Sequence, residues 1–379
     1  MTGTEDVQDP RLLRALEGVI DPELRRPITE LGMVRSARIQ DGTAVADIAL
    51  TVVGCPAADR IETDVRAALE TVAGPGRARV NVGVMTPQQR TELTERLRAG
   101  VPRGNAFGAD TLTSIIAVSS GKGGVGKSTL AVNIAAALAT QGKKVGMMDA
   151  DVHGFSVPRL LGLANTTPTR IDNMIVPPVA YGIKAISIGM FVGSSQPIAW
   201  RGPILHRTLK QFGSEVYFGD LDVLVVDLPP GTGDVAISAG QLMPTAGVIV
   251  VTTPQPAAAE VAVRAGQLAH TLGQRLLGVI ENMSWMQQGT ERIELFGSGG
   301  GAAVAAALTQ TTGYDVPLLA QVPFEQELRQ GGDDGEPSVL AHPELPSSLA
   351  IAQVARRALE RPGRLTHRLL PVTPAERGE

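Results

Sequence analysis

The sequence predicts an α/β protein in which a small α+β domain precedes a larger domain built on a parallel sheet. Apolar strands alternate with helical segments over the larger part, which is typical of a parallel sheet covered on both faces. A stretch containing glycine and proline, residues 99–105, separates the two parts. We therefore expect domains over residues 1–98 and 114–361, joined by a linker over residues 99–113.

The expected elements follow from the spacing of apolar residues. In the first domain we expect a helix over 10–19, strands over 34–39 and 44–53, a helix over 57–72, a strand over 78–84 and a polar helix over 86–97. In the second domain we expect strands that begin at Ser114, Lys144, Ile183, Val223, Gly247, Leu276 and Leu318, with helices between them. Residues 362–379 contain several prolines and no periodicity, so we expect a disordered tail.

A glycine-rich segment between the first strand and first helix of the second domain fits the phosphate-binding template G-x-x-x-x-G-K-[ST]. Its residues are Gly121, Lys122, Gly123, Gly124, Val125, Gly126, Lys127, Ser128 and Thr129. The glycines let successive backbone N–H groups face phosphate oxygens, and the helix N-terminus adds a partial positive charge. We expect Lys127 to contact the β- and γ-phosphates and Ser128 to ligate Mg²⁺.

A dinucleotide site is the alternative at the same glycines. Gly121, Gly123 and Gly126 also satisfy G-x-G-x-x-G, and Asp149 lies near the position of a ribose-binding acid. A dinucleotide site, however, has no use for the Lys-Ser pair that follows the third glycine. Phosphoryl transfer also needs a second, acidic strand end to hold Mg²⁺, and the apolar strand over 221–227 ends in Asp227. Both observations favour a nucleoside triphosphate site.

Lys122, directly after the first glycine, resembles the extra lysine of the deviant-Walker (SIMIBI-type) ATPases, the superfamily of the nitrogenase iron protein and cell-division positioning proteins. Asp149, Asp151 and Asp227 extend this resemblance. Further motifs make residues 114–340 similar to the Mrp/ApbC family of P-loop iron–sulfur cluster carriers. They are Trp-Arg-Gly-Pro at 200–203, Asp-Leu-Pro-Pro-Gly-Thr-Gly-Asp at 227–234, Glu-Asn-Met-Ser at 281–284 and Phe-Gly-Ser-Gly-Gly-Gly at 296–301.

The resemblance implies a homodimeric ATPase that uses Mg²⁺ and hydrolyses ATP slowly, with Lys122 contacting the partner subunit's nucleotide. It implies that Asp151 orients the attacking water, and that Asp149 and Asp227 support Mg²⁺. It also implies that Asn282 recognises adenine through its side-chain amide and that Pro323 packs near the base. Their positions at the ends of successive apolar strands favour these roles over solvated loop residues.

One departure from the family concerns cysteine. Many members carry C-x-x-C shortly after the Asn-Met-Ser motif, and two subunits then offer four thiolates to a bridging cluster. Residues 285–295 of this chain contain no cysteine, and the whole chain contains one, Cys55. Iron–sulfur clusters normally take four cysteine thiolates, so a homodimer of this chain lacks the usual ligand set.

Cys55 precedes Pro56, and proline is favoured in the first turn of a helix. A thiol at a helix cap has a lowered pKa; the simpler interpretation is a small apolar residue beneath the start of a helix. Residues 8–95 resemble the iron–sulfur-assembly (PaaD/SufT-like) domain fused to some Mrp proteins, through the Asp-Pro-Glu-Leu at 21–24 and the Thr51…Cys55-Pro56 segment. The resemblance implies a cluster-ligand or reactive-thiol role for this cysteine.

The composition of the chain limits which classes of partner and which cellular compartment are expected. The formal net charge of −4 argues against a general nucleic-acid-binding surface. A single cysteine suits a reducing cytoplasm, and the first residues show no signal peptide. No apolar stretch approaches the roughly 20 residues that span a bilayer. The segment over 349–359 is too short for a membrane-targeting helix and is broken by Pro362.

Three functions are left. The first is an ATP-dependent carrier that binds or transfers iron–sulfur clusters to client or assembly proteins. The second is a nucleotide-switched positioning or partitioning ATPase of the MinD/ParA type, which would need a membrane-binding helix or a basic surface. The third is a chaperone-like ATPase that holds no cluster of its own. We expect the first, with no nucleic acid and no membrane as partner.

Overall fold

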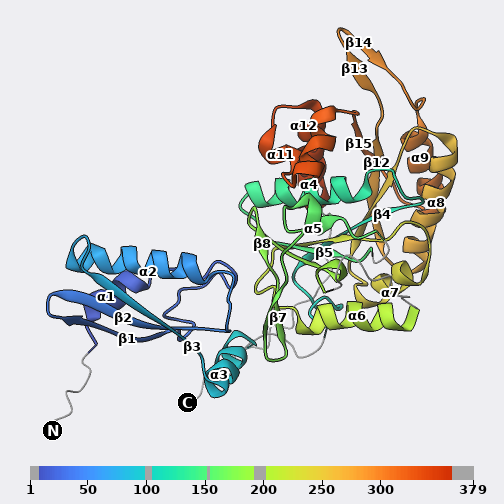
Figure 1. Cartoon of the computed structure of the whole chain (residues 1–379). Coiled ribbons are helices and arrows are strands. Elements are labelled where there is room, and N and C mark those ends of the chain that lie inside the picture. Colours follow the sequence, from blue (N-terminus) through green and yellow to red (C-terminus); the bar gives the residue numbers. More distant parts are fainter. Residues whose placement is uncertain (1–7, 99–104, 152–153, 192–201, 361–379) are drawn as a thin grey trace, which may run out of the picture.

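A computed structural model describes residues 8–98, 105–151, 154–191 and 202–360 (Figure 1). In Figure 1 the residues coloured blue form one body, and those coloured green to red form a second, larger one. The disorder expected over 362–379 lies outside the described residues. Residues 99–104 of the expected linker and the Trp200-Arg201 part of a family motif lie outside them as well.

The N-terminal domain is a three-stranded sheet with helices packed against it. Its elements are α1 (Pro10–Leu16), β1 (Val34–Gln40), β2 (Thr43–Leu50), α2 (Ala58–Ala73), β3 (Ala78–Val84) and α3 (Pro87–Arg98). The central strand β2 pairs antiparallel with β1 and parallel with β3. The connection from β2 to β3 is α2, whose buried residues Ile61, Val65 and Leu69 recur at helical spacing and form its core-facing side.

The larger domain is a mixed, mostly parallel sheet with helices on both faces. Its strands are β4 (Ser114–Ser120), β5 (Val145–Asp149), β6 (Thr169–Ile171), β7 (Met174–Val176), β8 (Val179–Ala180), β9 (Ile183–Ser187), β10 (Val223–Asp227), β11 (Gly247–Thr252), β12 (Arg275–Asn282), β13 (Met286–Gln288), β14 (Glu291–Ile293) and β15 (Leu318–Val322). Its helices are α4 (Lys127–Thr140), α5 (Val157–Leu160), α6 (Gly202–Glu215), α7 (Asp234–Leu242), α8 (Pro256–Thr271), α9 (Gly300–Thr312), α10 (Gln326–Asp334), α11 (Ser338–Ala341) and α12 (Pro346–Leu359). The predicted fold class is confirmed.

The main sheet has eight strands in the order β15-β12-β11-β4-β10-β5-β9-β8. Every pairing in it is parallel except that of the edge strand β8 with β9. After β4 the chain first adds β5, β9 and β10 on one side of β4. It then adds β11, β12 and β15 on the other side. Such a switch point opens a crevice at the carboxyl ends of the strands, where ligands bind in open α/β sheets.

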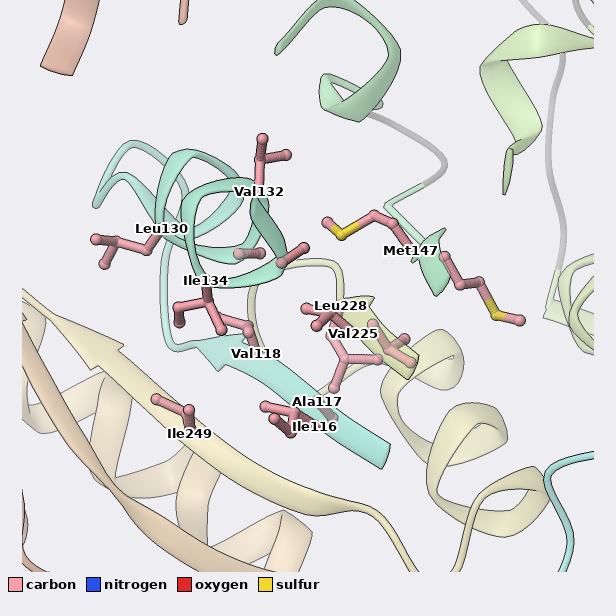
Figure 2. Packing of buried hydrophobic residues seen from close by; sticks show 14 of the residues in the cluster. Ile116, Ala117, Val118, Leu130, Val132, Ile134, Met147, Val225, Leu228 and Ile249 are labelled. Atoms are coloured by element: carbon pink, nitrogen blue, oxygen red, sulfur yellow. The ribbon is translucent and has the colours of Figure 1, made fainter. Parts of the chain in front are cut away.

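The core of this domain explains the near-continuous apolar character of its strands. In β4, Ile115, Ile116 and Val118 are fully buried, because helices cover both faces of the sheet. Figure 2 shows Ile134 of α4 beside Val118 of β4. On its other side α4 packs against α12, so nearly every residue from Leu130 to Leu138 is buried. This packing fixes the start of α4 against the end of β4.

The short hairpin of β6 and β7 packs against the N-terminal domain. Ile171, Met174 and Val176 of this hairpin are buried in the same hydrophobic cluster as the core of the first domain. Arg90 of α3 forms an ion pair with Asp172 at the hairpin turn, with 3.3 Å between Nε and Oδ1. The two domains are therefore joined by apolar packing as well as by the covalent connection.

The structure differs from the expected elements in three ways. The strand expected over 44–53 ends at Leu50, and the chain turns through Gly54, whose φ of +71° suits glycine. The helix expected over 10–19 ends at Leu16 in a turn that includes Gly18. The strands β6, β7, β8, β13 and β14 were not predicted, because segments of two or three residues carry no measurable periodicity.

Candidate functional site

The predicted phosphate loop connects β4 to α4 at the switch point of the sheet. Gly124 and Gly126 adopt φ angles of +80° and +81°, which favour glycine, and Gly126 is the N-cap of α4. Gly121 lies so close to α8 that a Cβ atom there would be 2.2 Å from the Val261 carbonyl carbon. The loop lines a cavity of about 520 Å³, which we call the phosphate cavity. The backbone N–H groups of the loop and the N-terminus of α4 make this cavity suitable for binding an anion.

Lys127, the first residue of α4, is buried in the phosphate cavity among carboxylates. Its Nζ lies 2.5 Å from Asp227 Oδ1 and 3.8 Å from Asp151 Oδ2. The Ser128 hydroxyl lies 3.3 Å from the same ammonium group. The sequence-predicted loop lysine and strand-end aspartate are thus brought into direct contact, and a triphosphate would supply further oxygens for the lysine.

Asp149 and Asp227 are adjacent in the register of β5 and β10, and both are almost fully buried. Burial, together with the neighbouring Asp227 charge, raises the pKa of Asp149 to about 8. Burial likewise raises the pKa of Asp227 above its ordinary value, although Lys127 opposes this shift. Two like charges side by side in a low dielectric favour a protonated form of the pair.

The two carboxylates differ in their hydrogen bonds. Asp149 accepts bonds from the Asp151 N–H (3.0 Å), the Val157 N–H (3.3 Å) and the Ser187 hydroxyl (3.0 Å). Asp149 therefore shapes the loop after β5 and does not line the phosphate cavity. Asp227 Oδ2 is buried with no hydrogen-bond partner among the described residues. The Ser128 hydroxyl is close enough to the Asp227 carboxyl group to lower its pKa, and a hydroxyl beside a carboxylate fits a site for a hydrated cation.

Asp151 lines the phosphate cavity together with the loop glycines. Its Oδ1 accepts a hydrogen bond from the Gly154 N–H at 3.1 Å, so the loop itself orients the carboxylate. Asp151, in the loop after β5, and Lys127, at the start of α4, thus face the same space. Residues 152 and 153, between Asp151 and Gly154, lie outside the described residues.

Lys122 also lines the phosphate cavity. Its Nζ donates a hydrogen bond to Gln255 Oε1 at 3.2 Å, and Gln255 is the N-cap of α8. In the single chain this lysine is therefore held by its own subunit through a neutral amide. A phosphate oxygen carries negative charge and is a stronger acceptor for the ammonium group than this neutral amide oxygen, so a nearby phosphate would compete for Lys122.

A second cavity, of about 310 Å³, adjoins the phosphate cavity and shares Gly126 and Thr129 with it. We call it the base cavity; Asn282, Met283, Pro323, Phe324 and Leu328 contribute to its wall. The Asn282 amide donates to the Val125 carbonyl at 2.8 Å, which ties the end of β12 to the phosphate loop. The structure therefore brings Asn282 and Pro323 together beside the loop, in a pocket of mixed apolar and amide character.

Cys55 does not occupy the cap position that the sequence suggested. The N-cap of α2 is Ala57, and Cys55 lies two residues before it, buried in the N-terminal core at 6% exposure. Burial raises the pKa of the Cys55 thiol to about 11, and the nearby charges of Glu23 and Asp21 add to this rise. The prediction of a lowered pKa is wrong, because desolvation outweighs the effect of the helix N-terminus.

The segment that carries C-x-x-C in many family members forms the hairpin of β13 and β14, which projects from the large domain in Figure 1. Arg292 stacks over Trp285 in this hairpin, with its guanidinium carbon 4.2 Å from the ring centroid. Among the described residues no group of three or more His, Cys, Asp or Glu side chains could hold a metal ion. None of the helices described is both long and apolar enough to cross a membrane.

Several residues of the site had no sequence signal. Ser187 and Gln255 lie at the end of β9 and the start of α8, and they contact Asp149 and Lys122. Arg159, Leu160 and Leu328 line the base cavity from short helices. Their positions depend on how α5 and α10 pack together, which local patterns do not encode. A search for polar residues at every strand end would have found Ser187.

The fold and this site define a P-loop NTPase. Residues 111–359 match the ParA family described as the NUBPL iron-transfer P-loop NTPase, and residues 10–82 match the family of iron–sulfur cluster assembly proteins. The chain belongs to the NUBPL iron-transfer P-loop NTPase family and carries an N-terminal domain of the iron–sulfur cluster assembly type. The resemblance inferred from the motifs is confirmed.

Curated relatives and a solved structure agree with this assignment. The chain is 48% identical over 350 residues to the iron-sulfur cluster carrier protein of Mycobacterium tuberculosis (strain H37Rv), covering 91% of each chain. It is 39% identical over 354 residues to a Synechocystis protein of the same name, covering 91% of this chain and 95% of that one. A nucleotide-binding protein from Archaeoglobus fulgidus, solved in complex with ADP, is 33% identical with a TM-score of 0.50 and covers 59% of this chain and 86% of that chain.

Proposed function

We propose that this protein is a homodimeric, Mg²⁺-dependent ATPase of the cytoplasm that binds iron–sulfur clusters or transfers them to apoproteins. The observation that carries the proposal is that Lys127 and Asp151 line one cavity bounded by the phosphate loop, while the buried Asp227 contacts Lys127 directly. The name shared by the curated relatives supports the cluster cargo. The single free cysteine suits a reducing compartment.

In this proposal ATP lies with its phosphates in the phosphate cavity and its adenine in the base cavity, beside Asn282 and Pro323. Lys127 exchanges part of its contact with Asp227 for the β- and γ-phosphates. Asp151 orients the attacking water, since its carboxylate is already held facing the cavity. Lys122 leaves Gln255 and contacts the phosphates of the partner subunit, which is why hydrolysis depends on the dimer.

The residues present fit a Mg²⁺ ion. The Ser128 hydroxyl and the unpartnered Asp227 Oδ2 would hold it, and Asp149 supports the site by fixing the loop that carries Asp151. Mg²⁺ binds few protein ligands and keeps several waters and phosphate oxygens, so one hydroxyl and one carboxylate suffice. When bound, the ion neutralises charge that develops on the phosphates.

The cluster is cargo, and the ATPase domain offers it no thiolate, because the chain's one cysteine is Cys55. We propose that the protein holds little or no stable cluster through its ATPase domain. A cluster that it does hold depends on Cys55 of both subunits, with the remaining ligands from a small thiol or a client. The buried thiol must first become accessible, so such binding requires a rearrangement of the N-terminal core that covers Cys55.

Anaerobic reconstitution tests this proposal. Wild type and Cys55→Ser are incubated with iron, sulfide and a glutathione-like thiol, and bound iron, sulfide and visible absorption are quantified. We expect substoichiometric iron in wild type and none in Cys55→Ser. A stoichiometric cluster in Cys55→Ser would contradict the proposal, because no protein thiolate would hold it. If wild type binds no iron but still accelerates cluster formation in an apo-ferredoxin, the chaperone-like function is favoured.

A further inference from the structure

A cavity of about 420 Å³ lies between the two domains, and we call it the interdomain cavity. Its wall combines the loop around Arg25 and Arg26 of the N-terminal domain with Lys144, Lys184 and Tyr217 of the ATPase domain. Figure 1 shows β8, the neighbour of β9, on the side of the large domain that faces the small one. The volume lies within the range of roughly 300–1,000 Å³ typical of small-molecule sites.

The interdomain cavity is separate from the nucleotide site. It lies at the amino ends of three neighbouring strands, since Lys144 immediately precedes β5, Leu221 precedes β10 and Lys184 is the second residue of β9. The phosphate cavity lies at the carboxyl ends of the same strands. Five-residue strands at about 3.3 Å per residue separate the two by roughly 15 Å. A ligand in one cavity therefore does not contact the other.

Lys184 is the central feature of this cavity. It lies in β9 between apolar neighbours and is only 4% exposed. Its Nζ lies 5.0 Å from the centroid of the Tyr217 ring, and it makes no hydrogen bond or ion pair with any residue that the structure describes. Burial lowers the pKa of Lys184 to about 8, so keeping a charge here is unfavourable. A purely structural position in this strand would be better filled by an apolar side chain.

The other charges around the cavity are also mostly positive. Arg25 donates to the Gly182 carbonyl across the interface at 3.1 Å, which holds its guanidinium against the ATPase domain. Arg26 is exposed beside it and has no ion-pair partner among the described residues. The one carboxylate among the lining residues, Asp220, is paired with Lys144 at 2.8 Å. Asp21 faces Lys184 from the N-terminal domain, beyond ion-pair distance.

We propose that the interdomain cavity binds a small oxyanion carrying at least two negative charges, a phosphate ester or a dicarboxylate, with Lys184, Arg25 and Arg26 as its counter-charges. The ligand would add a negatively charged partner for the buried ammonium, whose contact among the lining residues is the Tyr217 ring. Because its contacts come from both domains, the bound anion would also stabilise their contact. Arginine suits this role, since its planar fork binds phosphate and carboxylate oxygens in pairs.

Isothermal titration of the full-length protein tests the proposal with two probes, inorganic phosphate and malonate. The protein is first saturated with ADP and Mg²⁺ so that the nucleotide site is filled, and the ionic strength is held constant. We expect one site per chain for at least one probe. Phosphate binding alone would assign a phosphate-type ligand, and malonate binding alone would assign a dicarboxylate; either supports the site.

Variants of two lining residues, with a control outside the cavity, test whether the anion binds in the interdomain cavity. Lys184→Met keeps the length of the side chain and removes its charge, and it should weaken binding by roughly tenfold or more. Arg26→Gln changes an exposed residue, so it should weaken binding without affecting folding. Lys143→Met, at an exposed lysine outside the cavity, should bind as wild type does. Absence of binding by both probes, or unchanged affinity in both Lys184→Met and Arg26→Gln, would overturn the proposal.

Discussion

Lys127 Nζ and Asp227 Oδ1 lie 2.5 Å apart, which joins the first residue of α4 to the last residue of β10. The cation expected to bind the triphosphate is thus held by a buried carboxylate of its own chain. The attraction between the two opposite charges offsets part of the cost of burying them, and it keeps the ammonium group at the phosphate cavity. A nucleotide that enters adds oxygens to a lysine already in position, which is a form of preorganisation.

We predict that Gly126→Ala weakens ATP binding by roughly tenfold, because it disturbs both the loop and the base cavity. A Cβ atom at this position would lie 2.2 Å from Asn282 Nδ2, so Asn282 would have to move. Gly142→Ala is the matched control: its φ of +77° gives the same backbone strain, with open space around the added atom. The control should lose about 1 kcal/mol of stability and bind ATP normally. Equal ATP affinities in the two variants would contradict the proposed role of Asn282.

We predict that Lys122→Ala binds ATP but hydrolyses it poorly, because this lysine acts on the partner subunit's phosphates. Asp151→Ala should also bind ATP without hydrolysing it. In a 1:1 mixture the mixed dimer contains one intact site, so phosphate release should return to about a quarter of the wild-type rate. A mixture no more active than its parents would show that Lys122 and Asp151 act from the same subunit.

We predict that Cys55 is unreactive in the native protein. With a pKa of about 11 the thiol carries roughly 100-fold less thiolate at pH 8 than an ordinary cysteine, and it is buried as well. Alkylation by iodoacetamide, followed by mass spectrometry, should be much slower in buffer than in concentrated urea. Because the chain has one cysteine, every alkylated product reports this site. Equal rates in the two solvents would show that the thiol is accessible.

We predict that Lys184→Met stabilises the protein at pH 7 by on the order of 2 kcal/mol. The folded-state pKa of Lys184 is lowered to about 8, so its charge costs stability below pH 8. The cost falls as the pH rises from 8 through the unfolded-state pKa, above which the lysine is neutral in both states. In urea unfolding, the free energy of unfolding should therefore differ strongly between wild type and Lys184→Met at pH 7 and only slightly at pH 10. Lys143→Met should unfold with the wild-type free energy at both pH values.

The sequence predicted those features that depend on neighbouring residues. The template over residues 121–129 requires a strand before it and a helix after it, and β4 and α4 provide them. The sequence also indicated the acidic end of β10, because a carboxylate at the end of an apolar strand is unusual. Parallel strands then bring such ends to one edge of the sheet, so Asp149, Asp151 and Asp227 gather there.

The features that the sequence did not predict depend on packing between residues far apart in the chain. Cys55 has a raised pKa because α2 and the core beneath it bury the thiol, and no local pattern reports that burial. Lys184 is a single cation in an apolar strand, and its isolation depends on a different domain covering the edge of the sheet. The bond from Lys122 to Gln255 joins residues 133 positions apart.

Steady-state phosphate release by Lys127→Ala tests the central claim most directly. The account predicts that this variant neither binds nor hydrolyses ATP, because the phosphates lose their main counter-charge and the buried Asp227 carboxylate is left without its cation. Lys143→Ala, at an exposed lysine beyond the end of α4, should hydrolyse ATP at the wild-type rate. Wild-type turnover in Lys127→Ala would contradict the assignment of the phosphate cavity as the site of ATP hydrolysis.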